Sequence, residues 1–194
     1  MFDEYAENVE KVGTFDFGSK TDVTDPCYNK DVWCRTTVDT VPGRYNCYVS
    51  YSDEGNWGRR VSSIVIVHTD RGISTKDVDE RIGEIGVDAG LAGFFNGKPD
   101  YDDEGWSKIV DLCDFLNKDR LHYYFNSDGF FSDTGFGDGT YEVRGRRSEG
   151  GAYDMLQIIF IGEDEDDEEE DYYDTVSSGE SDWGELDENE DDDE

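Results

Sequence analysis

Two acidic residues stand in glycine-containing segments where chemistry could take place. Asp88 lies in residues 86–90 (GVDAG) and Asp138 lies in residues 135–139 (GFGDG). If the fold brought them together, the paired carboxylates could perform general acid–base catalysis or bind Ca²⁺. Residues 126–129 (NSDG) add oxygen ligands, but they lack the regular spacing and the bidentate Glu of an EF-hand loop. We therefore favour a structural role for these acids over catalysis or metal binding.

The alternating glycines of residues 135–139 resemble a phosphate-binding loop only superficially. Such a loop needs backbone N–H groups at a helix N-terminus, and it usually carries a lysine. Here a strand is expected to follow, and no lysine is near. The segment instead predicts a turn in which glycine supplies positive φ and Asp138 bonds the backbone.

Thiols and imidazoles are the other reactive groups. A catalytic thiol needs a neighbouring base, so a Cys–His dyad is one alternative, but buried structural thiols are the expectation. The cysteines are spaced by 7, 13 and 66 residues, which matches no zinc pattern. We predict no catalytic residue, no metal and no cofactor. The residues concerned are Cys27, Cys34, Cys47, Cys113, His68 and His122.

Charge restricts the classes of partner. The chain has 50 acidic and 17 basic residues, for a net charge of −33. Residues 163–194 hold 20 of the acids and no Lys or Arg, which leaves 30 acids and 17 bases, a net of −13, in residues 1–162. Such a surface repels nucleic acid and anionic lipid, so we expect a basic protein partner, with no direct nucleic-acid or membrane binding.

The few basic residues are clustered, which leaves two interpretations. They could pair with acids of the same domain, which we favour, or they could receive the acidic C-terminal segment. The cluster comprises Arg59, Arg60, Arg144, Arg146 and Arg147.

Residues 163–194 are predicted to be a disordered polyanionic tail, because their few apolar residues cannot offset the ordering entropy and charge repulsion. Trp183 and Leu186 could form a short motif that folds on a partner, or could be incidental in a solvated tail. The candidate partner-binding residues are Asp164, Asp166, Glu169, Trp183, Glu185 and Leu186.

Neither a signal peptide nor a membrane span is recognisable in the sequence, because no apolar run reaches ~18 residues. Early acids at Asp3, Glu4 and Glu7 also argue against a signal peptide. We expect a cytoplasmic protein with reduced thiols.

Hydrophobic periodicity predicts the elements that position these groups. Alternating or β-branched runs predict strands at 13–17, 44–51, 60–68, 140–144 and 153–161, with two further short strands within 82–95. The runs 44–51 and 60–68 are expected to form one hairpin, and the last two runs another. Residues 126–139 read as a loop. A helix is predicted after Asp102 and Asp103, with an apolar stripe of Trp106, Ile109, Val110, Cys113 and Leu116.

These elements predict a β-rich α+β fold, a compact antiparallel sheet or sandwich with one main helix and the disordered tail. Residues 1–12 form an N-terminal segment of marginal order in this prediction. Residues 13–162 form the acidic globular domain, and residues 163–194 form the tail.

Several short motifs occur in a fixed order: DPCY at 25–28, WC at 33–34, WGRRV at 57–61, GVDAG at 86–90 and GFGDGTY at 135–141. Together they resemble a family of uncharacterised proteins found in phages and bacteria. The resemblance covers about residues 13–161 and implies a small β-rich domain of phage origin, with no activity to carry over. The acidic tail departs from that pattern. The matching positions are Asp25, Cys27, Trp33, Trp57, Arg60, Asp88, Gly90, Asp138 and Tyr141.

The function expected from these observations is that of a non-enzymatic, phage-encoded acidic binding protein. It would engage a basic, nucleic-acid-binding surface of a host protein and inhibit defence or transcription as a DNA mimic. One alternative is a structural or chaperone-like accessory protein whose tail shields a basic partner. A second is a carboxylate- or metal-dependent enzyme.

Overall fold

The computed structural model describes residues 8–32, 34–71, 80–117 and 122–162. By its internal contacts the chain divides into Met1–Glu163 and Asp164–Glu194, and every described residue belongs to the first unit. The predicted tail, residues 1–7 and Trp33 lie outside the described residues. So do the candidate partner-binding residues Asp164, Asp166, Glu169, Trp183, Glu185 and Leu186.

Two antiparallel sheets make up the folded unit, so the β-rich prediction with one main helix is confirmed. The first sheet has the strand order β1-β4-β5-β11-β10-β6 and the second has the order β3-β2-β7-β9-β8. The first contains β1 (Val9–Phe17), β4 (Gly43–Asp53), β5 (Arg59–His68), β6 (Glu80–Val87), β10 (Gly139–Arg147) and β11 (Tyr153–Ile159). The second contains β2 (Lys20–Thr24), β3 (Thr36–Asp39), β7 (Leu91–Phe95), β8 (Tyr123–Phe125) and β9 (Gly129–Asp133).

Both predicted hairpins are present. β4 pairs with β5 from Tyr45↔His68 to Asp53↔Arg59, and β10 pairs with β11 from Glu142↔Ile159 to Arg147↔Tyr153. β11 also pairs with β5, so the two hairpins lie side by side in the six-stranded sheet. Their inward-facing side chains supply much of the core.

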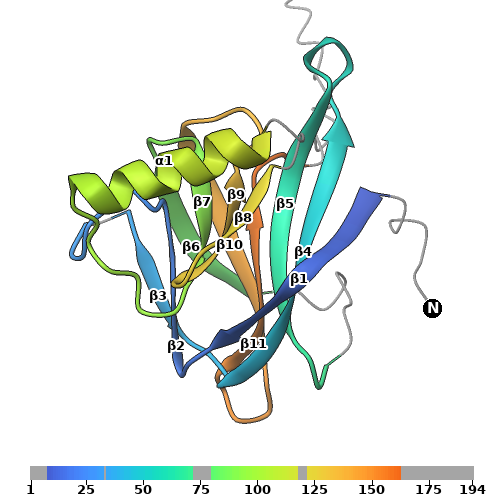
Figure 1. The fold of residues 1–194 in the computed structure, drawn as a ribbon. Helices are drawn as coiled ribbons and strands as arrows, with labels where there is room; N and C mark the ends of the chain where they lie inside the picture. The colour runs from blue at the N-terminus through green and yellow to red at the C-terminus, as the bar shows by residue number, and fades with distance from the viewer. Residues whose placement is uncertain (1–7, 33, 72–79, 118–121, 163–194) are drawn as a thin grey trace, which may run out of the picture. The chain divides into compact units, whose positions relative to one another are not determined.

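The folded unit has three layers, with the six-stranded sheet, the five-stranded sheet and helix α1 (Asp103–Asn117) stacked in that order (Figure 1). Successive side chains of a strand point to opposite faces of its sheet. The five-stranded sheet therefore contributes side chains both to the core between the sheets and to the core under α1. Phe130 joins the core between the sheets, and its neighbour Phe131 joins the smaller core under α1. Among the described residues, no helix is long and apolar enough to span a membrane.

Helix α1 forms where it was predicted, but its buried stripe is narrower. Ile109 and Cys113 are buried, and Trp106 and Leu116 pack beside them. Val110 is 41% exposed, which corrects its predicted place in the stripe. At 100° per residue, Val110 lies a quarter turn from Ile109 and faces away from the sheet.

The predicted loop at 126–139 was wrong in part, because it contains β9. The Gly and Asp residues there suggested a loop, yet Gly129 is a close-approach position: a Cβ at that site would lie 2.1 Å from the Phe94 carbonyl oxygen. β1 begins at Val9, four residues before its predicted start. β2, β3 and β8 had no sequence prediction because they are only 3 to 5 residues long.

Candidate functional site

Loops at one end of the two sheets carry most of the residues that the sequence motifs identify. Asp25 follows β2, Trp57 lies between β4 and β5, Asp88 follows β6, and Asp138 precedes β10. The pairings β2·β7, β7·β9, β6·β10 and β5·β11 bring these loops to the same end of the sandwich (Figure 1). We call residues 25–28, 54–58, 88–90 and 134–138 the motif end.

Asp25 connects two of these loops. Its side chain is fully buried, and Oδ1 accepts the N–H of Cys27 at 2.7 Å. Oδ2 accepts the N–H of Asp88 at 2.8 Å and that of Ala89 at 2.7 Å. A carboxylate that accepts three backbone N–H groups is held in place by strong, charge-assisted bonds. Asp25 also begins a turn, since the Tyr28 N–H donates to the Asp25 carbonyl at 3.2 Å.

A second buried polar group lies beside Asp25 and was missed by sequence reasoning. Lys98 is fully buried, and its Nζ donates to the carbonyls of Tyr28 at 2.7 Å and Pro99 at 2.8 Å. Burial, and then the nearby Arg35 guanidinium, lower the pKa of Lys98. Asp22 accepts the Lys98 N–H at 2.9 Å and forms a buried ion pair with Arg35 at 2.6 Å. Lys98 stands in a Gly-Lys-Pro turn, which carries no sequence signal for burial.

The thiol at the motif end is not poised for nucleophilic chemistry. Burial, followed by a hydrogen bond to Asp25, raises the pKa of Cys27 to about 12. A nucleophilic cysteine needs the opposite shift. His122 bonds Asp133 instead, with Nδ1 and Oδ2 2.9 Å apart, and His68 lies at the other end of β5. Within the described residues, neither histidine has a hydrogen bond to a cysteine.

Asp88 and Asp138 do come together in the backbone register, as considered from the sequence. Val87 pairs with Gly139 as the last pair of the β6·β10 ladder, so the two acids lie one position beyond it. Both are exposed. Across the described ranges, no three His, Cys, Asp or Glu side chains converge to hold a metal ion. Gly90 lies against this region, with its Cβ position 3.7 Å from Gly137 Cα.

Trp57, Arg60 and Tyr141 organise the other two loops. Arg60 Nε donates to the Trp57 carbonyl at 3.1 Å, and its Nη1 donates to the Gly135 carbonyl at 3.3 Å. The Tyr141 hydroxyl lies 2.6 Å from the Gly137 carbonyl and 3.1 Å from the Thr134 carbonyl. Through its two hydrogen bonds, the Arg60 side chain joins the loop 54–58 to the loop 134–138.

The remaining predicted basic residues pair within the domain. Arg146 Nε and Asp154 Oδ1 are 2.8 Å apart, Arg147 Nε and Glu80 Oε2 are 2.8 Å apart, and Arg144 bonds Glu142. Internal pairing is thus confirmed for these three. Arg59 instead stacks on the Tyr51 ring at 3.6 Å, and within the described ranges neither Arg59 nor Arg60 has a carboxylate within 4.0 Å.

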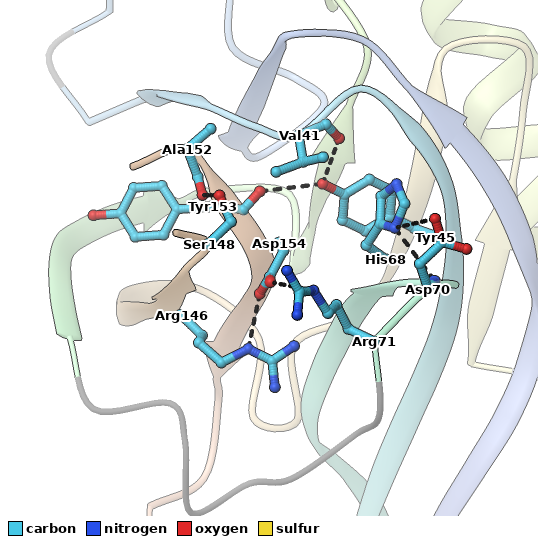
Figure 2. A network of polar contacts seen from close by, with 10 residues as sticks. All are labelled: Val41, Tyr45, His68, Asp70, Arg71, Arg146, Ser148, Ala152, Tyr153 and Asp154. Carbon is cyan, nitrogen blue, oxygen red and sulfur yellow. Dashed lines mark hydrogen bonds and ion pairs between the residues drawn. The ribbon is translucent and has the colours of Figure 1, made fainter. Parts of the chain in front are cut away.

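Figure 2 shows a network of polar contacts at the opposite end of the six-stranded sheet. Asp154 is buried between Arg71 and Arg146, with Arg71 Nε 3.4 Å from Oδ2. The Tyr45 hydroxyl is 2.7 Å from the Val41 carbonyl and 3.1 Å from the Tyr153 carbonyl, and the Tyr45 ring packs edge-on against His68. The contacts drawn in Figure 2 join residues of this domain to one another, which favours a structural role for the network.

In contrast to the arginines, several carboxylates on the solvent face of α1 have no cation partner among the described residues. Asp103, Asp111 and Asp114 are exposed, and within the described residues none forms an ion pair. Glu104 is the exception, because Lys108 Nζ lies 2.8 Å from it. Phe115, which is 64% exposed, lies on the same side of the helix. At 100° per residue, these three aspartates fall within an arc of about 80°.

Comparisons with known proteins found no match: no family model, no curated protein and no solved structure is similar to this chain. The resemblance to an uncharacterised phage and bacterial family therefore stays a prediction.

Proposed function

We propose that this protein is an acidic binding module that engages a basic, nucleic-acid-binding surface of a partner protein. The observation that carries the proposal is the carboxylate face of α1, formed by Asp103, Asp111 and Asp114, which form no ion pair among the described residues. A host nuclease, transcription component or other defence protein has a surface of the required charge. Occupation of that surface would exclude nucleic acid.

Most of the described arginines are paired within the domain whereas acids are in excess, and this difference supports a basic partner. The arginines at positions 35, 44, 71, 81, 144, 146 and 147 each lie within 4.0 Å of a carboxylate of the same domain. The acids are in excess, so many carboxylates are left to face the solvent. Charge complementarity of this kind accelerates association and makes it sensitive to salt.

Apolar side chains on the same helix face add a contact that nucleic acid lacks. Asp103 and Asp114 are 11 residues apart, about 16 Å along a helix with a rise of 1.5 Å per residue. That density of charge is lower than the one charge per ~1.7 Å of duplex DNA. Phe115 and Val110 therefore matter, because apolar contact supplies affinity that salt does not screen.

Capture of partners from a bacterial lysate treated with nuclease tests the proposal. The full chain is compared with a variant carrying Asp103→Asn, Asp111→Asn and Asp114→Asn, at about 50 mM and about 500 mM salt. We expect wild type to retain basic nucleic-acid-binding proteins at low salt, and the variant to retain several-fold less. If neither protein retains such a partner, the proposal is wrong.

The predicted alternative, in which the acidic C-terminal segment shields a basic partner, gives a different result. A chain ending at Gly162 should keep its binding if the α1 face is the main contact. Loss of all binding on that truncation, with the α1 variant unaffected, would favour the chaperone-like alternative.

A further inference from the structure

An exposed aromatic pair stands at the motif end, and the Arg60 guanidinium lies 5.9 Å from the centroid of one of its rings, that of Phe136. Trp57 is 69% exposed and Phe136 is 56% exposed. Their rings meet edge-to-face, with centroids 6.5 Å apart. Large aromatic residues of this kind are typical of binding hot spots, and they are otherwise costly to leave in water.

The two loops that present this pair are held in a fixed arrangement. Trp57 ends a short 3-10 turn (Gly55–Trp57), and Arg60 bonds the carbonyls of Trp57 and Gly135. Gly135 and Gly137 have φ of 68° and 103°, values that glycine adopts readily. A surface ordered before binding loses little conformational entropy when a partner arrives.

Charge at the motif end favours a cationic occupant. Besides the buried Asp25 and the His122-bound Asp133, four acids lie in or next to these loops: Asp53, Glu54, Asp88 and Asp138. Within the described residues none of the four forms an ion pair. Arg59 and Arg60 supply two positive charges, fewer than the negative charges of these acids. Arg60 is already bonded to two carbonyls, and Arg59 stacks on Tyr51.

The size of the patch fits a peptide segment better than a second copy of this chain. A fully exposed aromatic side chain offers about 150–250 Å², so the exposed fractions correspond to roughly 200–300 Å². A stable interface between folded proteins needs about 800 Å² on each partner. Two copies, each with a net charge of −33, would also repel one another.

We propose that Trp57 and Phe136 form the docking point for an arginine- or lysine-bearing segment of the basic partner. The inference rests on the proposed function, since it names where and by what chemistry the partner is held. A guanidinium or ammonium over the Trp57 ring gains a cation–π contact, for which Trp is the best of the aromatic side chains. Asp138 and Asp88 would lie beside that cation.

The test uses the full chain and a fluorescein-labelled peptide of alternating arginine and glycine, nine residues long. A matched peptide carries citrulline, which has nearly the shape of arginine without its charge. We expect the arginine peptide to bind, Trp57→Ala to weaken binding roughly fivefold, and Trp57→Phe to recover part of that loss. The citrulline peptide should bind weakly to every variant.

Tyr48→Ala, in β4, is the control, because it removes a partly exposed aromatic ring that lies outside both the motif end and the α1 face. It should leave peptide affinity unchanged. Circular dichroism checks that Trp57→Ala folds, and Trp57→Phe keeps the proposal falsifiable if it does not.

Three results would overturn the docking point: equal affinity of wild type and Trp57→Ala, equal binding of the citrulline peptide, or a Trp57-dependent dimer in sedimentation. The two proposals fail separately. Capture of basic partners that Trp57→Ala leaves unaffected removes the docking point alone. Trp57-dependent peptide binding without any captured partner removes the proposed function alone.

Discussion

Asp25 is the single residue on which the arrangement of the motif end depends most. Its carboxylate accepts the backbone N–H groups of Cys27, Asp88 and Ala89 from a fully buried position. Asp25→Ala leaves three donors without their acceptor, so we expect a loss of about 2–4 kcal/mol in the free energy of unfolding. Urea denaturation measures it. Asp111→Asn, an exposed control, should change stability by less than about 0.5 kcal/mol, and a similar loss in both variants would contradict the role of Asp25.

Cys47 supplies a prediction about pH at the same scale. It is fully buried, and burial raises the pKa of its thiol from 9.0 to about 12. The folded thiol therefore keeps its proton where the unfolded one loses it. The stability contributed by this group is complete below pH 9 and is lost as the pH rises towards 12.

Unfolding free energies at pH 8 and pH 10 test this linkage. Buried tyrosines lower stability in the same pH range, so the comparison needs a variant, Cys47→Ala. The fall from pH 8 to pH 10 should be about 1 kcal/mol smaller in Cys47→Ala than in wild type. An identical fall in both proteins would show that this thiol does not contribute.

How much of the site the sequence predicts is clearest from individual residues. Asp25, Trp57 and Asp138 could be selected because they stand in short motifs with Pro or Gly. Lys98 could not, because charged residues are almost never fully buried, and its two carbonyl partners come from a fold that spacing does not reveal. The sequence allowed Asp88 and Asp138 to lie close together but did not require it. The register of β6 against β10 places them next to each other.

At the scale of elements, β7 and β9 approach so closely that Gly93, like Gly129, excludes any side chain. A Cβ at Gly93 would lie 2.4 Å from the Phe130 carbonyl oxygen and 2.6 Å from Phe131 Cα. Both are backbone atoms, so the strands would have to separate. We expect Gly93→Ala to lower the free energy of unfolding by about 2–3 kcal/mol.

Gly83, in β6, is the matched control for that substitution. A Cβ there meets no atom within 4 Å. Gly83→Ala should therefore raise stability by about 0.5 kcal/mol, because glycine is unfavourable within a strand. Thermal or urea unfolding of both variants gives the comparison, and equal effects would refute the close approach at Gly93.

Tyr45 links the two sheets through the crossing segment between β3 and β4. Its hydroxyl reaches the carbonyls of Val41 and Tyr153 (Figure 2). Tyr45→Phe removes both of these hydrogen bonds, so we expect the free energy of unfolding to fall by about 1–2 kcal/mol. Tyr48→Phe is the neighbouring control, since Tyr48 is only partly buried, and its effect in urea denaturation should be within about 0.5 kcal/mol. Equal losses would mean that the link contributes nothing.

The sequence predicted the elements with strong periodicity and missed those without it. β5 contains a run of β-branched residues, and most residues of β11 are apolar, so both hairpins were recognisable. β9 was not, because Gly129 and Asp133 punctuate it and Phe130 and Phe131 face opposite cores. In a strand covered on both faces, alternation between polar and apolar residues disappears.

At the scale of the whole molecule, the fold determines which charged side chains are paired and which face the solvent. The net of −13 in residues 1–162 comes from 30 acids and 17 bases. Folding pairs most of the described arginines with carboxylates, and it leaves Asp103, Asp111 and Asp114 together on one helix face. The acidity is thus distributed over a rigid surface as well as over residues 163–194, which suits recognition of a basic partner by shape and charge.

Competition with nucleic acid is the measurement that tests this claim most directly. A captured basic partner is bound to a labelled DNA or RNA, and the full chain is titrated in. The account predicts stoichiometric displacement of the nucleic acid, weakened several-fold by the triple Asp→Asn substitution on α1 and by raised salt. A ternary complex in which the partner holds this protein and its nucleic acid together, at full affinity for both, would contradict it.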